Sequence, residues 1–138
     1  MGGPGDPTLH GGTLVVYNSA GSGEKATATL PASGWRVLGK TTAPKGYKFT
    51  GTDPNGPVSR VTVKGDQVRV RGGKANWTYT LNEASQGRMA VRVQLGTSAA
   101  WCADAPAKGM ISPGPNDRVD VFNAQPKTAA PAACPSVP

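Results

Sequence analysis

The sequence has little of what most enzymes use for chemistry: its 138 residues include one histidine, two cysteines and eight acidic residues. The single histidine, His10, lies beside two glycines near the start of the chain, where nothing would orient it as a general base. No serine lies in a Gly-x-Ser-x-Gly motif, and turn formation by itself explains most of the acidic residues. We therefore expect no catalytic residues and no enzymatic activity.

Metal, cofactor and membrane motifs are also missing. The sequence has no Cys-x-x-Cys pair and no Asp-x-Asp-x-Asp-Gly calcium loop, so we expect no metal and no cofactor. No apolar run is long enough to span a membrane. Met1 is not followed by a basic and apolar leader, so we expect either a leader that is missing from this sequence or a domain cut from a larger chain.

The two cysteines, Cys102 and Cys134, both lie late in the chain. We expect them to form a disulfide, because it would fix a Pro-rich C-terminal segment that has little else to hold it. On the chain-entropy model such a bridge stabilises the fold by roughly 3–4 kcal/mol. A disulfide implies an oxidising compartment, and hence an extracellular or cell-surface location. Two free thiols in a cytosolic protein are the alternative.

Apolar residues alternate with polar ones at a period of two, and turns rich in Gly and Pro recur about every ten residues. This pattern predicts an all-β chain, an antiparallel β-sandwich of Greek-key, Ig-like or jelly-roll type with about eight or nine short strands. We expect a flexible lead over 1–12, the sandwich over 13–123 and an Ala/Pro-rich tail over 124–138. The clearest expected strands are 13–17, 25–30, 47–50, 58–63, 68–70, 75–82, 88–95 and 118–122.

The best hairpin surrounds Gly65-Asp66, which fits a two-residue loop. Cross-strand partners then have residue numbers that add to 131. Valines fall on one face and polar residues on the other. The predicted pairs are Val63 with Val68, Val61 with Val70, Arg60 with Arg71, Thr62 with Arg69, and Lys64 with Gln67.

The chain has a net charge of +7, from 15 basic and eight acidic residues. Such a balance favours anionic partners, and arginine can bind phosphate, sulfate or carboxylate with two hydrogen bonds. If strand 88–95 neighbours the hairpin, its outward arginines extend a cationic sheet face. The predicted binding residues are Arg60, Lys64, Arg69, Arg71 and Arg92. We expect a non-catalytic module that binds an anionic polysaccharide, a nucleic acid or an acidic protein surface; a merely solvated face is the alternative.

Two other functions stay open. Trp35 follows a turn and is the tryptophan with the best chance of exposure, so it could stack on a neutral sugar, whereas Trp77 and Trp101 have the pattern of core residues. Alternatively, the chain is a structural module, a spacer or filament subunit, that self-associates through its sheet edges or its termini.

Several short motifs follow one another in a recognisable order. They are Gly34-Trp35-x-x-Leu38-Gly39, Lys45-Gly46-Tyr47-Lys48-Phe49, Asn82-Glu-Ala-Ser-Gln-Gly87, Trp101-Cys102 and Ala132-Ala133-Cys134-Pro135. In this order the chain resembles, over about 12–135, a bacterial all-β domain that recurs in secreted and surface proteins of myxobacteria-like and other environmental bacteria. The resemblance implies an extracellular module with its late cysteines paired. It implies no activity and no functional residues.

Overall fold

The computed structural model describes residues 3–65, 67–72, 76–97 and 100–138. Strands dominate this part of the chain, and the helices are short. In chain order the elements are α1 (Pro7–His10), β1 (Gly12–Asn18), β2 (Lys25–Leu30), η1 (Ala32–Gly34), β3 (Trp35–Lys40), β4 (Ala43–Thr50), β5 (Val58–Lys64), β6 (Gln67–Gly72), β7 (Arg88–Leu95), β8 (Trp101–Pro106), η2 (Lys108–Met110), β9 (Asp117–Arg118) and β10 (Val121–Phe122).

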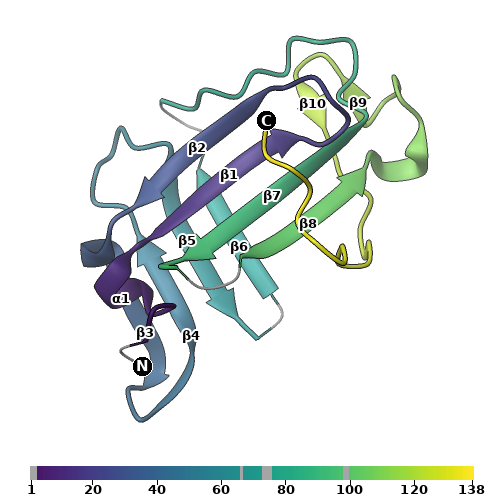
Figure 1. Ribbon diagram of the computed structural model, residues 1–138. Helices are drawn as coiled ribbons and strands as arrows, with labels where there is room; N and C mark the ends of the chain where they lie inside the picture. The colour runs from purple at the N-terminus through teal and green to yellow at the C-terminus, as the bar shows by residue number, and fades with distance from the viewer. Residues whose placement is uncertain (1–2, 66, 73–75, 98–99) are drawn as a thin grey trace. The chain divides into compact units, whose positions relative to one another are not determined.

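The strands form two four-stranded sheets and a small ribbon (Figure 1). One sheet has the order β2-β1-β7-β8, and the other is the meander β3-β4-β5-β6. The pairs within the meander are antiparallel. The prediction of an all-β fold is therefore confirmed, because eight strands form two four-stranded sheets. Strands β9 and β10 form only a small antiparallel ribbon.

Two of the expected strands are wrong. The strand expected over 75–82 does not form in its described part, 76–82, because Asn76 has the left-handed φ of 52° and the Thr80 amide donates to the Glu24 side chain instead of to a neighbouring strand. Residue 75 lies outside the described residues. The strand expected over 118–122 is a hairpin, since Asp120 has a φ of 65° and turns the chain between β9 and β10.

The chain divides into two compact units, each built from three segments. The first comprises 1–14, 28–77 and 93–101, and it contains the whole meander sheet. Its core includes Leu14, Leu30, Trp35, Phe49, Val58, Val61, Val63, Val93 and Leu95. The segment expected to be a flexible lead contains α1 in this unit, capped by the buried Asp6, whose side chain accepts from the Thr8 amide.

Trp35 is part of this core, so its predicted exposure is wrong: only 6% of its surface is accessible. Its indole N–H donates to the Leu30 carbonyl over 3.1 Å, and its ring centre lies 5.5 Å from that of Phe49. The period-two alternation of β3 turns Trp35 toward the same side of the sheet as its cross-strand partner Phe49. An aromatic ring held in this way has no face free for a sugar.

Gly34 lets the Phe49 ring approach the backbone beside Trp35. A Cβ at this position would lie 2.4 Å from the Phe49 ring and 3.1 Å from the Thr50 carbonyl oxygen. We expect Gly34→Ala to lower the free energy of unfolding by about 1–3 kcal/mol, the usual effect of overpacking a core. Urea denaturation checks this. Gly3→Ala, with no neighbour within 4 Å, is the control; equal stability of both variants would contradict the packing described here.

The second unit comprises 15–27, 78–92 and 102–138, and the C-terminal tail crosses the sheet within it. The predicted Cys102–Cys134 disulfide is confirmed and ties the tail to β8, with the two Cα atoms 5.6 Å apart. Val137 then packs on the buried cluster of Val15, Tyr17 and Ala90, which lies on β1 and β7. Figure 1 shows this strap, residues 134–138, as the yellow end of the chain passing over the sheet.

Two hydrogen bonds extend the strap across β1 and β2. The Tyr17 hydroxyl donates to the Pro135 carbonyl over 2.6 Å, and the Lys25 ammonium group donates to the Pro138 carbonyl. The strap thus runs from β8 to β2 across the order of the strands. The Tyr17 hydroxyl has a raised pKa because it is buried; Arg92 lowers that pKa and Asp104 raises it further.

Candidate functional site

The meander sheet has one apolar face and one basic face because apolar and polar positions alternate over most of its strands, apart from register shifts at Leu38/Gly39 and Val58/Arg60. The apolar positions of β3, β4 and β5 include Trp35, Phe49, Val61 and Val63, all buried. The positions between them carry cations, and the four strands contain eight of the fifteen Lys and Arg residues and no Asp or Glu. We call the outward set the cationic face; it comprises Arg36, Lys48, Arg60, Lys64, Arg69 and Arg71.

The register of the β5–β6 hairpin confirms every predicted pair. Arg60 lies opposite Arg71, Thr62 opposite Arg69 and Lys64 opposite Gln67, while the valines pair on the other face. Gly65 provides the left-handed φ of 59° that the turn requires. A register shift between Val58 and Arg60 allows Val58 to be buried on the same side as Val61 although the two are three positions apart.

Four of the cations form a continuous line across the strands, which we call the cationic run. It starts at Arg36 on β3, whose cross-strand partner is Lys48 on β4. Lys48 pairs with Thr62, so Arg60 is its diagonal neighbour on β5, and Arg60 in turn lies opposite Arg71 on β6. Directly opposite side chains have Cβ atoms about 5 Å apart, and diagonal ones about 7 Å. Each strand thus contributes one positive charge to the run.

Lys48 lies at the centre of this positive field. The nearby Arg60 guanidinium, followed by that of Arg36, lowers the pKa of Lys48 from its ordinary value, and the removal of water adds to this. Unlike the exposed arginines around it, Lys48 is half-buried. The two arginines therefore make the centre of the cationic run unfavourable for a further positive charge.

Of the five binding residues predicted from the sequence, the structure brings four together. Arg60, Lys64, Arg69 and Arg71 share the cationic face. Arg92 does not join them, because β7 pairs between β1 and β8 and belongs to the other sheet. Period-two alternation puts the half-buried Arg92 on the same side of β7 as the buried Ala90, and it does not show which strand lies next to it.

Sequence reasoning missed Arg36 and Lys48 as members of the site. The signal was present, since each lies between residues of the apolar face: Arg36 follows Trp35, and Lys48 lies between Tyr47 and Phe49. What the sequence did not provide was the pairing of β3 with β4 and of β4 with β5. That pairing places both residues beside the hairpin.

The cationic face has no aromatic ring. The aromatic residues of the four strands are Trp35, Tyr47 and Phe49. All three alternate with the cations and therefore lie on the apolar face. The two remaining tryptophans, Trp77 and Trp101, are half-buried and lie outside the meander sheet. Stacking on bases or sugar rings is therefore not available on this surface.

A second polar group, in the other unit, is a buried network centred on Asp117. This carboxylate, fully buried, accepts hydrogen bonds from the amides of Gln86 and Gly87, at 2.6 and 2.8 Å, and from the Ser112 hydroxyl. Burial raises its pKa, but the hydrogen bonds from Ser112, Gln86 and Gly87 outweigh burial and hold the pKa below its usual value. The carboxylate is occupied by two backbone amides and one hydroxyl, so we interpret the network as a structural clamp on the chain before β7.

The Gln86 side chain extends this clamp. Its carbonyl accepts from the Tyr79 hydroxyl over 2.5 Å and from the Asn18 amide over 3.2 Å, and its amide donates to Glu83 over 2.6 Å. Burial, followed by the charge of Glu24, raises the pKa of Tyr79 to about 12. The phenol therefore stays protonated and acts as a donor over the physiological range. Residues 79–86 form no strand, and these side-chain hydrogen bonds hold the segment in place.

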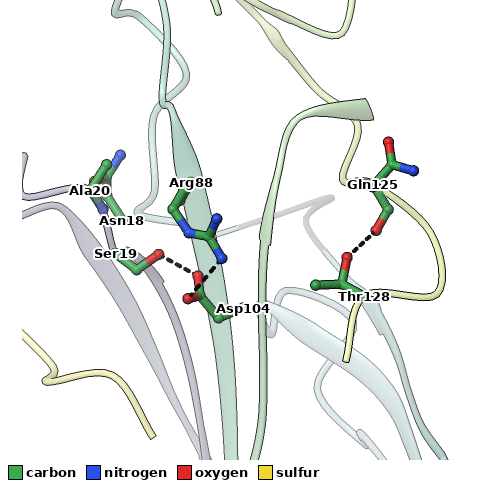
Figure 2. Close-up of polar contacts among 7 residues, drawn as sticks. All are labelled: Asn18, Ser19, Ala20, Arg88, Asp104, Gln125 and Thr128. Atoms are coloured by element: carbon green, nitrogen blue, oxygen red, sulfur yellow. Dashed lines mark hydrogen bonds and ion pairs between the residues drawn. The ribbon is translucent and has the colours of Figure 1, made fainter. Parts of the chain in front are cut away.

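Asp104, an acidic residue outside the turns, is also used structurally. Figure 2 shows its carboxylate between Ser19 and Arg88: the Ser19 hydroxyl donates over 2.5 Å and the Arg88 guanidinium over 3.2 Å. Asp104 on β8 is thus linked to Ser19, after β1, and to Arg88 on β7. The same view shows the Thr128 hydroxyl donating to the Gln125 carbonyl, which closes a turn in the tail.

The part of the chain that the structure describes contains neither a metal-ligating cluster nor a membrane-spanning helix. No group of three or more His, Cys, Asp or Glu side chains there could hold a metal ion. None of the described helices combines the length and the apolar character needed to cross a membrane. No protein-family model, curated protein or solved structure matches the chain.

Proposed function

We propose that the chain is a non-catalytic interaction module whose cationic face binds a linear polyanion. The observation that carries the proposal is the placement of like charges opposite one another, Arg36 with Lys48 and Arg60 with Arg71, in four strands without any acidic residue. Like charges in directly opposed positions destabilise a sheet. A polyanion that lies on the face removes this repulsion and releases its own condensed counterions.

The chemistry of the face favours phosphate or sulfate groups carried on a polymer. Arginine forms paired hydrogen bonds with such groups, and the cationic run provides one cation per strand. Without an aromatic ring the face cannot read bases or grip a neutral sugar by stacking. Binding that depends on charge in this way is sensitive to salt and tolerant of sequence.

The setting we propose is extracellular or at a cell surface. The Cys102–Cys134 disulfide supports an oxidising compartment, since such bonds are rare where thiols are kept reduced. The resemblance to a bacterial secreted domain agrees with this setting and stays a prediction.

The test measures binding to duplex DNA and to heparin across a range of salt concentrations. With six phosphate contacts, we expect affinity for DNA to fall roughly 10³-fold between 50 and 200 mM salt. Arg69→Gln combined with Arg71→Gln removes two exposed charges of β6, so the logarithmic salt slope decreases by about 1.8, at roughly 0.9 for each contact. The DNA and heparin arms distinguish phosphate from sulfate as the preferred group.

The matched control is Lys108→Gln with Lys127→Gln, which changes the net charge by the same amount at exposed positions of the other unit. It should leave the salt slope nearly unchanged. Equal slopes for the wild type and the β6 variant, or an equal decrease for the control, would show that net charge and not the cationic face governs binding.

A further inference from the structure

Two threonines lie among the cations at the centre of the cationic face. Lys48 and Thr50 leave β4 on the outward side, and Arg60 and Thr62 leave β5 on the same side. Lys48 lies opposite Thr62, and Thr50 lies opposite Arg60. We call these four residues the quartet.

The quartet alternates charge and hydroxyl around its corners. Its two cations occupy one diagonal and its two threonines the other, because each cross-strand pair combines one of each kind. Neighbours along a strand on one face are about 6.7 Å apart, and opposed Cβ atoms about 5 Å. Donors of four side chains therefore surround an area the size of one small anion.

The neighbouring strands add positive charge around the quartet. Arg36 lies opposite Lys48 on one side, and Arg71 lies opposite Arg60 on the other. None of the four strands contains a carboxylate that would occupy the donors. Lys48 and Thr62 are half-buried, whereas the arginines around them are exposed.

We propose that the quartet is a seat for a single tetrahedral oxyanion, the phosphate or sulfate ester group of the bound polymer. This proposal rests on the proposed function and makes it more specific, since diffuse attraction needs only the charges, whereas a seat also uses the hydroxyls. An ammonium, a guanidinium and two hydroxyls offer donors from several directions to an anion with three or more oxygen acceptors. A planar carboxylate with two oxygens uses fewer of them. The cationic face should therefore prefer sulfated or phosphorylated polymers to carboxylate polymers of the same charge.

The decisive variant is Thr62→Val, which removes a hydroxyl without changing charge, shape or β-branching. We expect its affinity for heparin to fall about tenfold, the effect of losing one hydrogen bond to a charged group, with the salt slope unchanged. Its affinity for poly-glutamate should stay the same, so that the preference for the sulfated polymer decreases. Thr29→Val, at an exposed position of β2 in a different sheet, is the control and should have no effect.

Nuclear magnetic resonance with inorganic phosphate and inorganic sulfate gives a second readout, in which the shifts should centre on the amides of Lys48, Thr50 and Thr62. Unchanged preference and unchanged affinity in Thr62→Val would overturn the seat, whatever the arginine variant does. If Thr62→Val has no effect but Arg69→Gln with Arg71→Gln still lowers the salt slope, the seat fails and the proposed function survives. If no charge variant changes binding, both fail.

Discussion

Asp117→Ala is expected to lower the free energy of unfolding by about 3 kcal/mol or more. The change leaves the buried amides of Gln86 and Gly87 without their acceptor and removes the partner of the Ser112 hydroxyl. A buried donor without a partner costs about 1–3 kcal/mol, and two amides lose theirs here. Urea denaturation followed by circular dichroism measures the loss.

Asp53→Ala is the control for this variant. Asp53 is exposed, and its carboxylate accepts one hydrogen bond, from the Asn55 amide within a turn. We expect its removal to cost no more than about 1 kcal/mol. A loss for Asp117→Ala as small as that for Asp53→Ala would mean that the buried network does not clamp the chain.

The pH dependence of the same variant has a defined sign. The Asp117 pKa is lower in the folded protein than its ordinary value of 3.8, so the folded state favours the ionised carboxylate. Its contribution to stability is therefore complete above pH 3.8 and is lost as the pH falls through the lower, folded pKa. The stability difference between the wild type and Asp117→Ala should shrink on acidification in that range. A difference that grows instead would contradict the depressed pKa.

Removing the disulfide is expected to have the other large effect. The variant Cys102→Ser with Cys134→Ser opens a bridge between residues 32 positions apart, which stabilises the fold by roughly 3–4 kcal/mol on the chain-entropy model. The strap then depends on its other contacts, such as those with Val15, Tyr17, Ala90 and Lys25. We expect lower stability in denaturation and increased binding of a dye that detects apolar surface.

A shortened chain without residues 135–138 separates the bridge from the contacts. It keeps Cys134 but loses the Pro135 carbonyl, Val137 and the Pro138 carbonyl. If the bridge acts mainly by restricting the unfolded chain, the shortened chain should retain most of the stability that the double serine variant loses. If the shortened chain binds the dye and the double serine variant does not, the strap contacts and not the disulfide keep the apolar surface of the sheet covered.

Local pattern was sufficient where one strand or one turn decided the structure. The alternation of 25–30 gives the buried positions of Ala26, Ala28 and Leu30 in β2, because side chains of a strand point alternately to its two faces. Gly65 allowed the register of β5 and β6 to be worked out pair by pair, since a two-residue loop fixes which residues face each other. The disulfide was predicted from two cysteines and a Pro-rich tail for which the sequence offered little other anchorage.

The same reasoning failed where the outcome depended on more than one strand. Trp35 follows a turn and has an exposed arginine beside it, yet its pairing with Phe49 places it in the core. The alternation over 76–82 is as regular as that of true strands, but side chains such as Glu24 occupy the backbone donors. Neither result is visible in the segment itself.

The amino-acid sequence alone determined the all-β class, the period-two faces, the register of one hairpin and the cysteine pair. Only the tertiary structure decided which strands are neighbours: it placed Arg36 and Lys48 beside Arg60, moved Arg92 to another sheet and laid the tail across β8, β7, β1 and β2. The physical reason is that alternation is a property of a single chain segment. The choice of a neighbouring strand depends on contacts between residues far apart in the sequence, which no local pattern encodes.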